Sequence, residues 1–173
     1  GVPENHFGTV LDNIKALAGV KDESTLGVGF LTGPTTKQEI VSAAELVRDL
    51  GADYIQYRPF NHDQTIVSEQ IHLAEGLYSR GGFSVLASWP KYDLMEKGTA
   101  WRKPYSVCHW HNFGAVVNAK GDLHFCCDHR TRSGYVGSVH ESSVRKLWTS
   151  RKKLEMARTI DLSKCPPLCR GNV

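Results

Sequence analysis

Five cysteines lie in two short stretches of this chain, and their side chains are the ones best suited to chemistry. Cys108, Cys126 and Cys127 fall between residues 105 and 130, Cys165 and Cys169 lie near the carboxyl end, and the first 107 residues contain no cysteine. Thiolates are soft ligands that select iron–sulfur clusters or zinc. This clustering predicts an inorganic centre, and we expect Cys108, Cys126, Cys165 and Cys169 to be its ligands.

A predicted β-hairpin brings two of these ligands together. An apolar run at 115–117 is followed by a Gly-containing turn at 118–121 and by a second strand at 122–127. Such a hairpin returns the chain beside its start, so Cys108 and Cys126 can lie close to each other. The alternative is that the cysteines are buried free thiols or oxidise to disulfides, but the paired spacing favours metal binding.

Cys127 and four neighbouring histidines belong to the same region. Because adjacent strand residues point to opposite faces, Cys126 and Cys127 are not expected to reach one centre, and Cys127 is predicted to pack with Leu123 and Phe125. Mixed cysteine and histidine sets are common for zinc, so each histidine is either a zinc ligand or, as we prefer, a neighbour of the centre. These histidines are His109, His111, His124 and His129.

In the part of the chain before the cysteines, short apolar runs alternate with stretches that have the apolar spacing of a helix. Apolar runs predict three buried strands, at residues 26–32, 53–60 and 83–88. Amphipathic stretches predict helices between them, at residues 36–50 and 63–80, and Thr36 with Glu39 has the spacing of a capping box. This order predicts the α/β class, with a parallel sheet and right-handed crossovers. Three apolar strands cannot close a barrel and need cover on both faces, so we expect part of a larger α/β unit.

Beyond these strands we predict a linker at 91–105, the hairpin, a short extended piece at 134–139 and a helix that reaches about residue 159. The formal charge of +3 and the absence of a basic stripe argue against nucleic acid as a partner. No apolar run has the length of a membrane span, and the first residues do not form a signal peptide. We therefore expect a cytoplasmic protein without a membrane partner.

These residues resemble a known family. The segments 27–33 and 54–59 resemble the fifth and sixth strands of the barrel of radical S-adenosylmethionine enzymes. Cys108, the Gly-turn-Cys hairpin that ends at Cys126, the segment 136–148 and the final cysteine pair are similar to an auxiliary-cluster domain of the SPASM or twitch type. The resemblance implies a partial (β/α) barrel at 1–104, followed by a SPASM/twitch-like iron–sulfur domain at 105–173.

The resemblance also implies ligands. The cysteine set would bind an auxiliary [4Fe–4S] cluster, and S-adenosylmethionine in the full-length protein would lie against Gly29, Gly33 and Ile55. Arg58 joins this set because open α/β sheets bind ligands beyond the carboxyl ends of their strands. The family cleaves S-adenosylmethionine with a C-x3-C-x2-C loop, and no cysteine precedes Cys108. We therefore expect this chain alone to be inactive.

The expected function is that of the C-terminal portion of a radical S-adenosylmethionine oxidoreductase or maturase. Its auxiliary cluster would transfer an electron or anchor the substrate, and its partners would be a small-molecule or peptide substrate and an electron donor protein. The alternative is a non-catalytic module that binds zinc through the same cysteines for folding. A fragment with free thiols and no metal is a third possibility.

Overall fold

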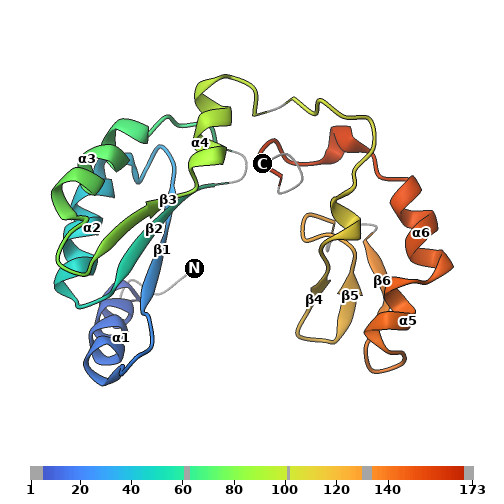
Figure 1. Ribbon diagram of the computed structural model, residues 1–173, viewed down its shortest axis with the longest axis horizontal. Coiled ribbons are helices and arrows are strands. Elements are labelled where there is room, and N and C mark those ends of the chain that lie inside the picture. The colour runs from blue at the N-terminus through green and yellow to red at the C-terminus, as the bar shows by residue number, and fades with distance from the viewer. Residues whose placement is uncertain (1–5, 61–62, 101, 130–133, 170–173) are drawn as a thin grey trace. The chain divides into compact units, whose positions relative to one another are not determined.

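A computed structural model describes residues 6–60, 63–100, 102–129 and 134–169. The chain divides into two compact units, residues 1–99 and 100–173 (Figure 1). The assignments of 1–104 as barrel and 105–173 as cluster domain stay predictions. No helix of the described residues combines the length and the apolar character needed to cross a membrane.

The first unit is built on a parallel sheet of three strands in the order β1-β2-β3 (Figure 1). The strands are β1 (Gly27–Thr32), β2 (Tyr54–Pro59) and β3 (Ser84–Ala87). The crossovers contain α2 (Ile40–Asp49), which follows the short 3-10 helix η1 (Lys37–Glu39), and α3 (Ser68–Tyr78). The unit also contains α1 (His6–Val20) and α4 (Trp89–Glu96). The predicted α/β class and parallel strands are confirmed, whereas closure into a barrel stays a prediction.

Two local predictions for this unit were wrong. Residues of the predicted linker form α4, which has a proline in its first turn and buries Tyr92 and Met95 on one side. The predicted capping box does not form, because the Thr36 hydroxyl accepts a hydrogen bond from the Gly33 N–H at 2.9 Å and donates to the Leu31 carbonyl at 3.1 Å. Thr36 therefore closes the turn after β1 rather than capping a helix.

The two faces of the parallel sheet differ in cover. On one face Ile55 and Tyr57 are fully buried together with Ile40 and Ala44 of α2, and the Tyr57 hydroxyl donates to the Ile40 carbonyl at 2.6 Å. On the other face, side chains such as Leu31 are exposed. Parallel sheets are normally covered on both faces, so within the described residues this sheet is half covered.

Asp53 ties the start of β2 to the segment before β1. Its carboxylate accepts a hydrogen bond from the Leu26 N–H at 2.7 Å and forms an ion pair with Lys21. The hydrogen bond from Lys21 and then the one from Leu26 lower the pKa of Asp53. A lowered folded-state pKa means that this contact stabilises the fold above about pH 4 and that the stabilisation is lost as the pH falls through the folded-state pKa.

We therefore expect Asp53→Asn to lower the melting temperature at pH 7, with the difference from wild type shrinking toward zero in acid. Thermal unfolding followed by circular dichroism between pH 7 and about pH 3 measures this difference. Asp12→Asn, which removes an exposed carboxylate of α1, is the matched control. A deficit that is as large in acid as at pH 7 would contradict the role given to the Asp53 charge.

The second unit contains an antiparallel sheet in the order β4-β5-β6 (Figure 1). Its strands are β4 (Val116–Val117), β5 (Asp122–His124) and β6 (Tyr135–Ser138). Its helices are η2 (Trp110–Asn112), α5 (Val144–Trp148), α6 (Arg151–Arg158) and η3 (Leu162–Lys164). The predicted hairpin is confirmed, and Gly121 closes its turn at a φ of 79°, a conformation that favours glycine.

A small apolar core holds this second unit together. Leu123, Phe125 and Val136 are almost fully buried, and partly buried side chains of Leu147, Met156 and Ile160 pack against them. The single helix predicted to reach residue 159 is broken in two. The side chains of Ser143 and Ser150 each cap the start of a helix by accepting a backbone N–H, so α5 and α6 begin separately.

Candidate metal centre

The four cysteines predicted as ligands line one small pocket of the second unit. They come from three separate parts of the chain. Cys108 precedes η2, Cys126 lies in the bend after β5, and Cys165 and Cys169 bracket the loop after η3. Cys169 is buried and the other three are half-buried. The other lining residues are Trp110, His111, Phe125, Asp128, His129 and Ile160.

The hairpin and its core position Cys126. Phe125 is anchored in the core and its ring stacks on that of His129, with the centroids 5.6 Å apart. Burial raises the pKa of the Cys126 thiol to about 11, while backbone N–H groups of Asp128 and His129 favour its thiolate. The metal-free thiol is therefore protonated at neutral pH, and backbone donors face the sulfur when a metal displaces the proton.

The loop between Cys165 and Cys169 is held by contacts from other segments. The Lys103 ammonium donates to the carbonyls of Pro166 at 2.8 Å and Pro167 at 3.2 Å. Burial raises the pKa of Cys165, neighbouring cysteines raise it further, and the Lys103 charge acts in the opposite direction.

Two more groups lie near these cysteines. The Nε2 atom of His129 lies 3.7 Å from the sulfur of Cys165. Burial, followed by the charges of Cys169, Cys108 and Cys165, raises the pKa of Tyr105 to about 12. The Tyr105 hydroxyl therefore interacts electrostatically with three of the four predicted ligands.

Cys127 occupies a different position from the one predicted. Strand β5 ends at His124, so the alternation of strand side chains does not apply to the two cysteines that follow. The sulfurs of Cys126 and Cys127 and a carboxylate oxygen of Asp128 all lie within 4.8 Å of one another. Cys126 packs against the core, whereas Cys127 is absent from both the core and the pocket lining. The predictions that Cys127 packs with Leu123 and that Cys126 and Cys127 cannot reach one centre were both wrong.

The histidines separate into two groups. His111 and His129 line the pocket, whereas His109 is exposed and His124 is buried with its ring edge-to-face on Tyr135. Burial, and then the charge of Lys153, lower the pKa of His111. Within the described residues, only these two histidines line the pocket and are placed to complement the cysteines.

The donor set fits an iron–sulfur cluster. Four cysteines line a pocket together with the apolar side chains of Trp110, Phe125 and Ile160, and thiolate ligands with apolar neighbours are a typical setting of such clusters. Backbone N–H groups of Asp128 and His129 favour the thiolate of Cys126, and the charge of Lys103 favours that of Cys165, as expected around a negatively charged cluster. The same thiolates also suit zinc. Each cysteine as a ligand stays a prediction.

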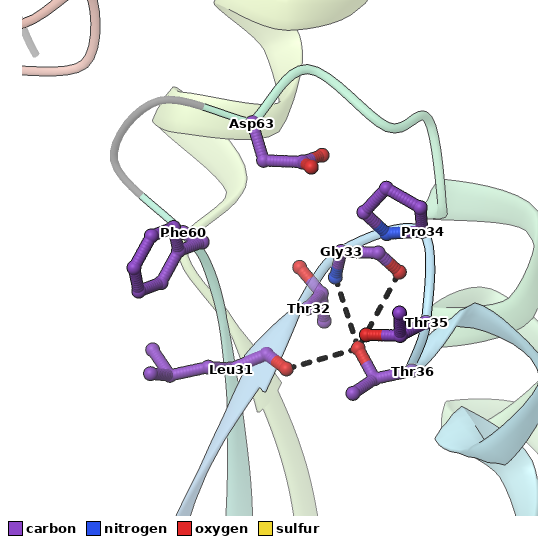
Figure 2. A pocket seen from close by; sticks show the side chains of 8 residues that line it. All are labelled: Leu31, Thr32, Gly33, Pro34, Thr35, Thr36, Phe60 and Asp63. Carbon is purple, nitrogen blue, oxygen red and sulfur yellow. Dashed lines mark hydrogen bonds between the residues drawn. The ribbon is translucent and has the colours of Figure 1, made fainter.

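The residues predicted to contact S-adenosylmethionine lie in the first unit. Gly33 lines a pocket of about 230 Å³ beyond the carboxyl ends of β1 and β2, together with Leu31, Thr36, Phe60 and Asp63 (Figure 2). Figure 2 shows the hydrogen bonds of the Thr36 hydroxyl, which donates to the carbonyls of Leu31 and Gly33 and accepts from the Gly33 N–H.

The other three residues of that prediction do not line this pocket. Gly29 pairs with Gln56 across β1 and β2, and both lie on the less covered face of the sheet with Arg58. The Arg58 guanidinium donates to the Gln56 side chain. Ile55 is fully buried on the helix-covered face. The structure thus groups Gly29 with Arg58, places Gly33 at the strand ends, and separates Ile55 from them.

Comparison with known protein families agrees with the geometry of the second unit. Residues 108–171 match the family model SPASM, described as an iron–sulfur cluster-binding domain. No curated protein matches the chain. The match begins at Cys108 and includes all five cysteines. Most of the second unit is therefore similar to a SPASM iron–sulfur cluster-binding domain, as the resemblance of its cysteine pattern predicted.

Proposed function

We propose that this chain is the C-terminal portion of a radical S-adenosylmethionine oxidoreductase or maturase. Its second unit would bind an auxiliary [4Fe–4S] cluster through Cys108, Cys126, Cys165 and Cys169. The observation that carries the proposal is that these four cysteines line one pocket, within the SPASM match. When bound, a cluster held by all four cysteines supplies one-electron transfer to or from a substrate radical, whereas a cluster held by three of them would leave an open iron that holds the substrate.

The protein's own residues prepare this pocket for a charged group. The apolar side chains of Trp110, Phe125 and Ile160 line it beside the cysteines. Backbone N–H groups of Asp128 and His129 face Cys126. Burial and hydrogen bonds to sulfur are the main means by which a protein sets a cluster's reduction potential, so these residues would tune the electron-transfer step.

The sheet of the first unit is consistent with part of a (β/α) barrel in a longer enzyme. Its parallel sheet has one face covered by helices and one face with exposed side chains, as expected of strands taken from a (β/α) barrel. We propose that Gly29, Gly33, Ile55 and Arg58 border S-adenosylmethionine in the full-length protein, with Ile55 contributing through its backbone. A small molecule or peptide would be the substrate, and an electron donor protein would be the redox partner.

Anaerobic reconstitution with iron and sulfide tests the cluster. We expect brown protein that contains about four iron and four acid-labile sulfide per chain, with an electron paramagnetic resonance signal after reduction. A chain that retains no iron or sulfide under these conditions would contradict the proposal. A C-x3-C-x2-C motif encoded upstream in the same reading frame tests the radical S-adenosylmethionine part separately.

A zinc-binding structural module is the second candidate. It is favoured by the position of His129, whose Nε2 atom lies 3.7 Å from the Cys165 sulfur, because mixed Cys/His sets are typical zinc ligands. Colourless protein that contains one zinc per chain after anaerobic purification, and that does not exchange the zinc for iron and sulfide, would support this candidate.

A further inference from the structure

Lys103 donates hydrogen bonds within the second unit to a loop far from it in sequence, and the proposed function assigns no role to these contacts. It lies before Cys108 in sequence, yet its ammonium reaches the carbonyls of Pro166 and Pro167, 63 and 64 positions later. These two prolines occupy the loop between Cys165 and Cys169. One lysine thus joins the segment that leads to the first predicted ligand to the loop that carries the last two.

Lys103 adds hydrogen-bond donors to a loop whose sequence offers few. Pro166 and Pro167 have no backbone N–H, so the loop has few donors of its own. The Cys169 N–H donates to the Pro166 carbonyl at 3.2 Å, and Pro167 is fully buried. Buried carbonyls require partners, and Lys103 supplies hydrogen bonds to both proline carbonyls. The loop is therefore held in the conformation that turns its cysteines into the pocket.

The charge of Lys103 also acts on the site. No carboxylate of the described residues lies within ion-pair distance of its ammonium, so its positive charge is not neutralised by an acidic partner there. A cluster with four thiolate ligands carries net negative charge, which increases by one on reduction. A nearby cation favours the reduced form.

We propose that Lys103 is a positioning residue that fixes the loop bearing Cys165 and Cys169 and stabilises the reduced state of the bound cluster. This inference rests on the proposed function for its second part only. The first part concerns the fold of the loop and is testable without metal.

The test compares Lys103→Met, which keeps the length of the side chain but removes its charge and donors, with Lys103→Arg, which keeps both. Lys120→Met, at an exposed position in the β4–β5 turn, is the control for the same change in net charge. In the reduced, metal-free chain, alkylation of each cysteine by iodoacetamide is followed by mass spectrometry. We expect Cys165 and Cys169 to react about tenfold faster or more in Lys103→Met, because their protection depends on the lost hydrogen bonds.

In the reconstituted chain we expect Lys103→Met to release iron to a chelator about 10- to 100-fold faster than wild type, the range typical of lost contacts around metal ligands. Its midpoint potential should be more negative than that of wild type. Lys103→Arg should stay close to wild type in all three measurements, and Lys120→Met should be unchanged. Rescue by arginine is expected for both parts of the proposal, and the midpoint potential is the measurement that reports the effect of the charge on the cluster.

Two results would overturn the proposal. One is equal alkylation of Cys165 and Cys169 in Lys103→Met and Lys120→Met. The other is equal acceleration at all five cysteines, which signifies general unfolding rather than release of the loop. If the wild-type chain binds no cluster, the proposed function fails, but alkylation of the metal-free chain still decides whether Lys103 holds the loop.

Discussion

Cys126→Ala is expected to abolish cluster binding, with iron falling from about four atoms per chain to a small fraction of one after reconstitution. Cys126 lines the pocket with Cys108, Cys165 and Cys169. A [4Fe–4S] cluster held by four cysteines loses one corner when a thiolate is removed, and alanine offers no replacement donor. Iron and sulfide assays on anaerobically reconstituted protein, together with visible absorbance, measure the loss.

The neighbouring residue provides a close control. Cys127 is the next residue in sequence and its sulfur lies within 4.8 Å of that of Cys126, but it does not line the pocket. Cys127→Ala should therefore retain the iron and sulfide content of wild type. Loss of the cluster in Cys127→Ala and retention in Cys126→Ala would show that the two cysteines exchange roles, and would refute the predicted ligand set.

Phe125→Ala should lower the free energy of unfolding of the second unit by about 3–5 kcal/mol, the range for removing a large aromatic side chain from a core. Phe125 is 1% exposed, packs with Leu123 and Val136, and stacks on His129 at the pocket. Hydrogen exchange followed by mass spectrometry on the full chain should show loss of protection in β5 and β6, because this core holds them in place. Strands of the first unit should keep their protection.

Phe113 is the matched control for this substitution. It belongs to the same unit but is 80% exposed, so Phe113→Ala should change stability by no more than about 0.5 kcal/mol. Equal losses of protection in the two variants would contradict the core assignment. Reduced cluster retention in Phe125→Ala, with normal retention in Phe113→Ala, would further connect the core to the pocket.

The sequence predicted the elements whose residues carry a local signal. The parallel strands were visible as apolar runs, and the hairpin was visible as a turn ending in Gly121 between two short strands. Helix α4 was missed because its burial depends on a distant contact. The Tyr92 hydroxyl lies 2.8 Å from that of Thr32, 60 positions earlier, and no local pattern reveals such a pair.

The sequence also indicated which cysteines could lie together, but not every residue around them. Cysteine spacing and hairpin geometry indicated which sulfurs could meet, and the structure places Cys108, Cys126, Cys165 and Cys169 around one pocket. The position of Cys127 was missed because an irregularity between Leu123 and His124 ends the strand early. The role of Lys103 was missed because its partners are main-chain carbonyls, which a pattern of side-chain types cannot identify.

The half-covered sheet of the first unit has a practical consequence. Strand β1 pairs only with β2 among the described elements, and Leu31 and Leu86 are exposed on the same sheet. An open strand edge beside apolar side chains invites pairing with another polypeptide. Purified alone, the chain should self-associate increasingly as its concentration rises, and sedimentation should reveal species heavier than one copy even where the second unit is correctly folded.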